Sequence, residues 1–185
     1  MKYILSTILL LGSIVSSAQN QDKWCPDWVD PNYPTNECIN YSFTPATVYT
    51  PNNSPVPVQK WVSGDWSQNT KDAFPGYWQS YHNNTLIVEG EATIKYNCHE
   101  WAWYGRTDFS MYRNSAQIFF SSCDQSYVLT TSTHHPSIVW FDADDHSAET
   151  TSTAGYFVSK WGDGPRFKHP IKECPYRTTN FFIIL

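Results

Sequence analysis

Five cysteines constrain this chain more than any other feature, because an odd number leaves at least one thiol unpaired within a single molecule. A bond between Cys25 and Cys38 would close a short N-terminal loop, and one between Cys123 and Cys174 would tie the middle of the chain to its end. Cys98 would then remain free. Counting alone does not choose among the five cysteines, so this choice depends on the residues around Cys98.

The first eighteen residues are typical of a secretory signal peptide. Lys2 gives a positive start, a mainly apolar run follows from Tyr3 to Val15, and small residues precede an expected cleavage site before Gln19. The apolar run has about 13 residues, fewer than the roughly 20 that a membrane-spanning helix needs. We therefore expect a secreted or periplasmic protein without a membrane anchor, in a compartment where disulfide bonds form.

Proline shapes the first part of the mature chain. Eight of the twelve prolines lie before residue 76. Because proline fixes φ and lacks a backbone donor, residues 24–57 are predicted to form extended coil and short edge strands, including one at 44–50. We expect residues 19–60 to be an extension that wraps a domain spanning 61–185. Pro75-Gly76 predicts a turn within 68–82.

A helix is predicted to begin near Cys98. Asn97 is a favoured N-cap residue, and Glu100 follows three positions later, as in a capping box. Gly105 is suited to end the helix. Residues 115–120 are expected to form a second short helix or coil.

The second half of the chain has the pattern of β-structure. Residues 137–141 form an apolar, β-prone run, and 142–145 form an acidic turn. Residues 146–151 and 156–161 are predicted to pair as a hairpin around 152–155, and 180–185 to form a last strand. The expected fold class is therefore α+β.

The surroundings of Cys98 are those of a reactive thiol. A cysteine at a helix N-terminus has a lowered pKa, because the helix dipole and the free N–H groups favour the thiolate. The same donors can bind an oxyanion. An imidazole within hydrogen-bond reach would complete the site. His99 points about 100° away on the helix, whereas His146 begins a strand after the acidic turn, so we expect His146 to be the base.

Two segments carry a resemblance to a known group. Residues 96–99 (YNCH) with 101–104 (WAWY) resemble the nucleophile motif of NlpC/P60- and CHAP-like cysteine hydrolases, in the variant NCHxxAW. Residues 145–148 and 158–162, with Pro165 and His169 further on, resemble the histidine half. The resemblance covers roughly residues 81–176. It implies a papain-like fold, with the nucleophile at a helix N-terminus packed on an antiparallel sheet, and cleavage of amide bonds, often in cell-wall peptides.

A third polar residue usually orients the histidine in this group. Pairing the hairpin symmetrically about Thr153-Ala154 places Ser159 on the same sheet face as His146. A one-residue slip would bring Lys160 there instead. We expect Ser159 as the third catalytic residue, although it departs from the His, Asn, Asp or Glu of the group. A backbone carbonyl or a neighbouring aspartate could replace it.

The expected partner is a peptide or peptidoglycan substrate. Asn97, Trp101 and Trp161 are expected to bind it, while Trp103 is expected in the core. The net charge of −5, without a basic patch, excludes a typical nucleic-acid binder. No cofactor or metal is expected, and nothing predicts the oligomeric state.

Three alternatives stay open. Nine tryptophans would suit a non-enzymatic extracellular module that binds carbohydrate or protein. The chain could also be an inactive relative of the hydrolases. A metal site is the third, although the candidate ligands match no standard zinc or calcium spacing. These ligands are Cys98, His99, His134, His135, Asp142, Asp144 and His146.

Overall fold

The structure is a computed structural model that describes residues 22–25, 36–105, 107–130, 135–141, 145–176 and 181–184. The expected signal peptide and most of the acidic turn at 142–145 lie outside the described residues. Within them, the chain forms two antiparallel sheets and a few helices, which confirms the α+β class. Cys25 and Cys38 form the expected disulfide. No helix in the described part of the chain is long and apolar enough to cross a lipid bilayer.

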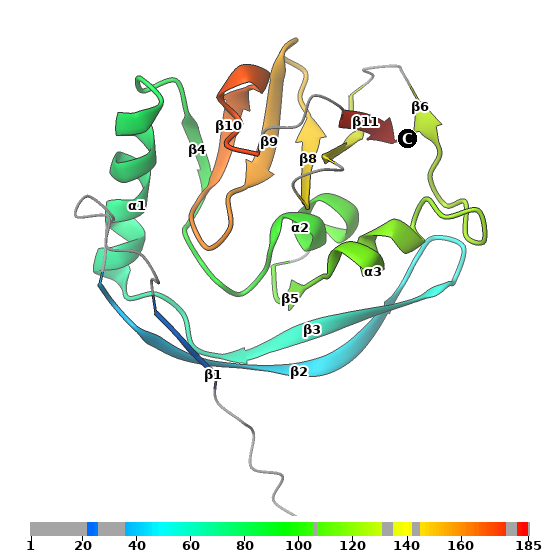
Figure 1. Cartoon of the computed structure of the whole chain (residues 1–185), viewed down its shortest axis with the longest axis horizontal. Helices are drawn as coiled ribbons and strands as arrows, with labels where there is room; N and C mark the ends of the chain where they lie inside the picture. Colours follow the sequence, from blue (N-terminus) through cyan, green and yellow to red (C-terminus); the bar gives the residue numbers. More distant parts are fainter. Residues whose placement is uncertain are drawn as a thin grey trace, which may run out of the picture.

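The two sheets lie on either side of two short helices (Figure 1). These helices are α2 (Cys98–Tyr104) and α3 (Arg113–Ile118). The main hydrophobic core fills the same layer: Trp103 and Ala116 from the helices meet Val56 and Val58 from one sheet and Trp140 from the other. Because both sheets bury a face against α2 and α3, the helices are held from two sides.

The larger sheet has seven strands in the order β4-β10-β9-β8-β7-β11-β6, all antiparallel where paired. The strands predicted at 137–141, 146–151, 156–161 and 180–185 are confirmed to within one residue at each end. Their bounds are β4 (Ile87–Gly90), β6 (Leu129–Thr130), β7 (Ile138–Phe141), β8 (His146–Thr150), β9 (Tyr156–Lys160), β10 (Arg166–Pro170) and β11 (Phe181–Ile184).

The β8–β9 hairpin has the symmetric register that the sequence predicted. Glu149 pairs with Val158, and Thr150 with Phe157, so the hairpin is centred on Thr153-Ala154. Successive side chains of a strand point to opposite faces. Ser147 faces α2, where its hydroxyl is bonded to α2 side chains, and His146 therefore projects from the other face. There it stacks on the ring of Tyr176.

The smaller sheet has the order β1-β2-β3-β5, with a long β2–β3 hairpin beneath α2 and α3 in Figure 1. The prolines of this region lie in longer strands than the sequence predicted. Pro45, Pro55 and Pro57 occupy positions where β2 or β3 has a paired neighbour on one side only, so the missing N–H breaks no ladder. The bounds are β1 (Asp22–Trp24), β2 (Ile39–Tyr49), β3 (Pro55–Ser63) and β5 (Phe109–Ser110).

The expected division between 19–60 and 61–185 falls inside β3. This strand pairs with β2 on one side and with β5, from the later segment, on the other. The N-terminal segment therefore supplies β1, β2 and the first part of β3 to the sheet that packs on the central helices.

The turn predicted at Pro75-Gly76 is wrong, because α1 (Gln68–Tyr81) runs through it as a helix. Ser67 caps its first turn by accepting from the Thr70 N–H. Phe74 is fully buried against Trp66 and Ala92. Burial of this apolar side chain outweighs the hydrogen bond lost at the proline, which is how tertiary packing overrides a local breaker signal.

The second expected disulfide is not formed. Cys123 is exposed, Cys174 is buried after the short 3-10 helix η1 (Ile171–Glu173), and both thiols are free. Cys98 is also free, as the sequence predicted, but it is one of three unpaired cysteines.

Candidate active site

Cys98 opens α2 where the sequence placed it. The Glu100 N–H donates to Asn97 Oδ1 at 3.0 Å, which makes Asn97 the N-cap. Gly105 ends the helix in the left-handed conformation, with φ of 68°, where glycine carries no steric penalty. The amide of Asn97 also donates to Met111 O at 2.6 Å. Asn97 therefore uses its side-chain oxygen and one amide N–H to hold the helix start next to Met111.

The Cys98 thiol is buried, and its exposed fraction is 8%. Burial raises its pKa to about 11, although the backbone N–H groups of Ser147 and His99 act against that rise. The lowered pKa expected from the helix N-terminus is therefore wrong for this conformation. The free-energy cost of desolvating the thiolate exceeds the stabilisation that a seven-residue helix and two N–H groups provide.

The sulfur of Cys98 lies directly beside the backbone of His146. The Ser147 N–H that donates toward the sulfur belongs to the peptide group joining His146 to Ser147. α2 packs on both β8 and β9, which holds this contact in place. The sulfur therefore lies beside the His146 backbone, whereas the imidazole projects from the sheet face opposite α2 and stacks on Tyr176.

The His146 ring is completely buried and has an unusual environment. Neither ring nitrogen has a hydrogen-bond partner among the described residues, so the expected bond to the Cys98 sulfur is not formed here. Burial lowers the pKa of His146 well below its ordinary value. The ring stacks on Tyr176 with 3.7 Å between centroids and 11° between planes.

The other two buried histidines are fully bonded. His99 Nε2 donates to Asp145 Oδ1 at 3.0 Å, and its Nδ1 lies 2.8 Å from Ser147 Oγ. His169 Nε2 lies 2.9 Å from Ser159 Oγ, and its Nδ1 donates to Pro170 O. His146 differs from both in having two buried nitrogens without partners.

The His99 contacts were missed by sequence reasoning. Trp103 Nε1 also donates to Ser147 Oγ at 2.9 Å, so two residues of α2 meet one hydroxyl of β8. The bond from His99 lowers the pKa of Asp145. The order Asp–His–Ser resembles a catalytic chain, but Ser147 is fully buried and its oxygen already accepts from Trp103. These contacts fix α2 on β8 and so position Cys98.

Ser159, the expected third residue, is bonded elsewhere. Its hydroxyl accepts from Trp161 Nε1 at 2.9 Å as well as contacting His169. It lies on the same sheet face as His146 but does not bond the His146 ring. The Trp161 side chain is 2% exposed, so it forms core rather than the wall of a groove. Trp103 is in the core, as expected.

Lys160 is a buried cation near the thiol. Its ammonium donates to Gly162 O at 2.6 Å and to Gly164 O at 2.5 Å, and it lies 5.4 Å from the centre of the Tyr96 ring. Burial lowers its pKa to about 8. Its charge lowers the pKa of Cys98, so Lys160 favours the thiolate.

Trp101, expected to bind substrate, is half-buried on the outer side of α2. The Arg166 guanidinium lies 5.0 Å from its ring centre. Both line a hollow of about 250 Å³ together with Glu149. Burial raises the pKa of Glu149. This hollow has charges of both signs and an aromatic wall.

The described residues hold no group of three or more metal-ligating side chains. His134, Asp142 and Asp144, which the sequence offered as ligands, lie outside these residues. His135 is exposed, and its ring contacts Thr150 O at 2.9 Å.

No family model, curated protein or solved structure matches this chain. The interpretation of the site therefore depends on its own geometry.

Proposed function

We propose that the protein is a secreted cysteine hydrolase that cleaves amide bonds, with Cys98 as the nucleophile and His146 as the base. A peptide, from the cell wall by analogy with the NlpC/P60- and CHAP-like group, is the proposed substrate class. In this proposal α2 on β8 and β9 is the papain-like arrangement of a nucleophile helix on an antiparallel sheet.

One observation carries the proposal: both nitrogens of a fully buried imidazole are without hydrogen-bond partners. Such a group costs about 1–3 kcal/mol of stability. His99 and His169 avoid this cost through two hydrogen bonds each. An uncompensated buried polar group calls for an explanation, and a base held ready for a proton from Cys98 or a substrate provides one.

In the resting site the thiol and the imidazole are both uncharged, and the site is closed. The raised pKa of Cys98 and the lowered pKa of His146 both favour uncharged groups at pH 7. In the proposed mechanism, the Tyr176 ring leaves His146 when substrate enters. The start of β8 then rearranges so that the imidazole, which projects from the sheet face opposite α2, reaches the sulfur, and the nearby charge of Lys160 stabilises the thiolate.

The proposed reaction has two steps. The Cys98 thiol gives its proton to His146, and the sulfur attacks the amide carbonyl carbon. The C–N bond breaks, the amine leaves with the proton from His146, and a thioester remains. His146 then takes a proton from water, and the resulting hydroxide releases the acid and restores the thiol. The N–H groups at the start of α2 are proposed to bind the oxyanion.

The test is turnover of purified peptidoglycan and of synthetic wall peptides, followed by mass spectrometry of the products. All variants carry Cys123→Ser, because the exposed Cys123 thiol reacts with labels on its own account. We expect hydrolysis by this background protein and none by its Cys98→Ala form. Cys174→Ser is the matched control, because Cys174 is a buried free thiol outside the proposed mechanism. Equal turnover with and without Cys98 would refute the proposal.

The closed state has its own test. Tyr176→Ala removes the ring that covers His146, so we expect Cys98 to react with iodoacetamide at least about tenfold faster. Tyr176→Phe keeps the ring and is expected to react at the background rate. Equal rates for the two variants would show that Tyr176 does not close the site.

A further inference from the structure

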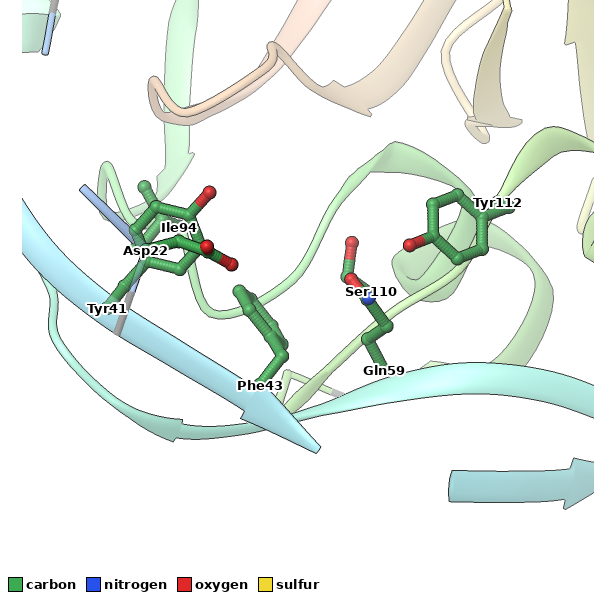
Figure 2. Close-up of a pocket in the computed structure, with 7 residues that line it drawn as sticks. All are labelled: Asp22, Tyr41, Phe43, Gln59, Ile94, Ser110 and Tyr112. Atoms are coloured by element: carbon green, nitrogen blue, oxygen red, sulfur yellow. The ribbon is translucent and has the colours of Figure 1, made fainter. Parts of the chain in front are cut away.

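A second candidate site lies in the smaller sheet, and two of its residues flank Met111, which is hydrogen-bonded to Asn97. Figure 2 shows a cavity whose walls come from all four strands of that sheet and from two loops beside it. Its volume is about 410 Å³, within the range of roughly 300–1,000 Å³ typical of small-ligand sites. Asp22 comes from β1, Tyr41 and Phe43 from β2, Gln59 from β3, Ser110 from β5, and Ile94 and Tyr112 from the flanking loops.

The polar groups of this cavity are unused by the fold. The side chains of Asp22, Tyr41, Gln59, Ser110 and Tyr112 form no side-chain hydrogen bond within the described part of the chain. They provide a carboxylate, an amide and three hydroxyls around one space. These five polar side chains, which have no hydrogen-bond partner among the described residues, are suited to a ligand that both donates and accepts hydrogen bonds.

The aromatic walls add an apolar surface. Tyr41 and Phe43 meet edge to face, with 5.7 Å between ring centroids and 74° between planes. Both rings are half-buried, and Tyr112 is 58% exposed across the cavity. Figure 2 shows Phe43 between Tyr41 on one side and Ser110 with Gln59 on the other. The ring faces therefore lie within reach of the same space as the polar groups.

The charge of the cavity limits the ligand. Among the described residues that line it, Asp22 carries the only formal charge, and no lysine, arginine or histidine is present. Burial raises the pKa of Tyr41, and Asp22 and Tyr112 raise it further, so these three groups act on one another. An anionic ligand would meet a carboxylate with no cation to offset it.

A quaternary ammonium ion fits less well. It would interact favourably with Asp22 and the rings, but it neither donates nor accepts hydrogen bonds. Gln59 and Ser110 would be desolvated without new partners, and each such group carries a penalty. A sugar ring suits both the aromatic and the polar groups of the cavity. Its C–H face packs on an aromatic ring, and its hydroxyls bond the carboxylate, amide and hydroxyl groups.

We propose that this cavity binds a neutral or amino sugar unit of an oligosaccharide. The proposal uses no group of the Cys98 chemistry, so it holds whether or not the chain is a hydrolase. Phe43 supplies the stacking surface, and Asp22 and Gln59 bond the ring hydroxyls.

Isothermal titration of the purified protein with chitotriose, cellotriose and maltotriose tests the proposal, with sialyllactose and choline as the anionic and cationic probes. We expect saturable binding of at least one neutral or amino trisaccharide and none of sialyllactose. Phe43→Ala is expected to raise the Kd for the bound trisaccharide at least about tenfold. Asp22→Asn, at an exposed position that the fold tolerates, is expected to raise it several-fold.

The matched control is Tyr104→Ala, which removes an exposed aromatic ring outside the cavity and should leave Kd unchanged. Circular dichroism verifies that each variant is folded. Absence of saturable binding for all three trisaccharides would overturn the proposal. So would tighter binding of choline than of any sugar, or sugar binding that survives both cavity substitutions.

Discussion

The Cys98–His146 site and the sugar-sized cavity differ in how the protein treats polar groups. At the starts of α2 and β8, Cys98 and His146 are buried, and burial keeps both neutral. In the smaller sheet, Asp22 and Tyr112 are exposed at an open cavity and keep their water. A polar group without a protein partner lowers the stability of the fold when it is buried, as at His146. It costs almost nothing when it is exposed to water, as at Asp22.

This difference separates two kinds of function. A buried imidazole without partners is maintained at a cost to stability, which suits a group that must exchange a proton away from water. Exposed hydroxyls and amides cost little, which suits reversible binding of a hydrated ligand. The comparison predicts that substitutions in the larger sheet change turnover and stability, whereas those in the smaller sheet change affinity alone.

The largest expected effect is on turnover. Replacing Cys98 by alanine removes the sulfur on which the proposed thioester forms, so we expect amide hydrolysis to fall at least about a thousandfold. The melting temperature should change little, because Cys98→Ala removes a single side-chain heavy atom from a site held by Asn97 and His99. Sugar binding at the cavity should be unaffected. A comparable loss of sugar binding would mean that the two regions are coupled.

The next effect is the dependence of stability on pH. Burial lowers the pKa of His169 to about 4 from its ordinary 6.5, and His146 shifts in the same direction. The unfolded chain therefore binds protons that the folded chain does not, and stability is full above pH 6.5 and lost as the pH falls toward 4. The His169 shift alone corresponds to about 3 kcal/mol.

Chemical denaturation between pH 7 and 4 measures this loss. His169→Phe should flatten the profile, since it removes one of the titrating groups, while Tyr104→Ala should leave its shape unchanged. An unfolding free energy that stays constant over this range would contradict the buried, neutral state of these rings.

Sequence reasoning found the parts of the larger sheet that depend on local pattern. The β-prone run of β7, the register of the β8–β9 hairpin and the cap of α2 by Asn97 are all local features, and all are confirmed. The free thiol of Cys98 was found as well. Its pKa was predicted in the wrong direction, because a helix terminus is visible in sequence whereas burial by the rest of the fold is not.

The features that the sequence did not reveal come from long-range packing. α1 crosses Pro75-Gly76 because Phe74 is buried by Trp66 and Ala92. The cavity joins residues from position 22 to position 112, and no local spacing connects them. Sequence reasoning rejected His99 as the base because it is adjacent to Cys98. In the structure, His99 bonds Asp145 and Ser147 and so fixes α2 on β8.

Exchanging two histidines for phenylalanine sharpens the contrast within the larger sheet. His146→Phe keeps a ring for Tyr176 to stack on and removes two unpartnered nitrogens. We expect the unfolding free energy to rise by about 1–2 kcal/mol while turnover is lost. His169→Phe breaks the contact with Ser159 and should lower the unfolding free energy by a similar amount. Denaturant titration of both variants measures these changes in unfolding free energy. Destabilisation by His146→Phe would show that the His146 ring stabilises the fold.

The smallest expected effect concerns the disulfide, which bears on the cavity and not on Cys98. β1 has three residues, and the bond from Cys25 to Cys38 ties it to the start of β2. Asp22 of β1 is one wall of the cavity. In the Cys25→Ser/Cys38→Ser protein a strand this short loses its covalent tether and is expected to detach part of the time. Sugar binding should then weaken a few-fold, as titration would measure, and hydrolysis should stay at the level of the parent chain.

Asp22→Asn weakens the same binding by removing the carboxylate. Adding Asp22→Asn to the Cys25→Ser/Cys38→Ser protein should therefore lower the affinity little further. A full additive loss of affinity would show that β1 stays in place without the disulfide.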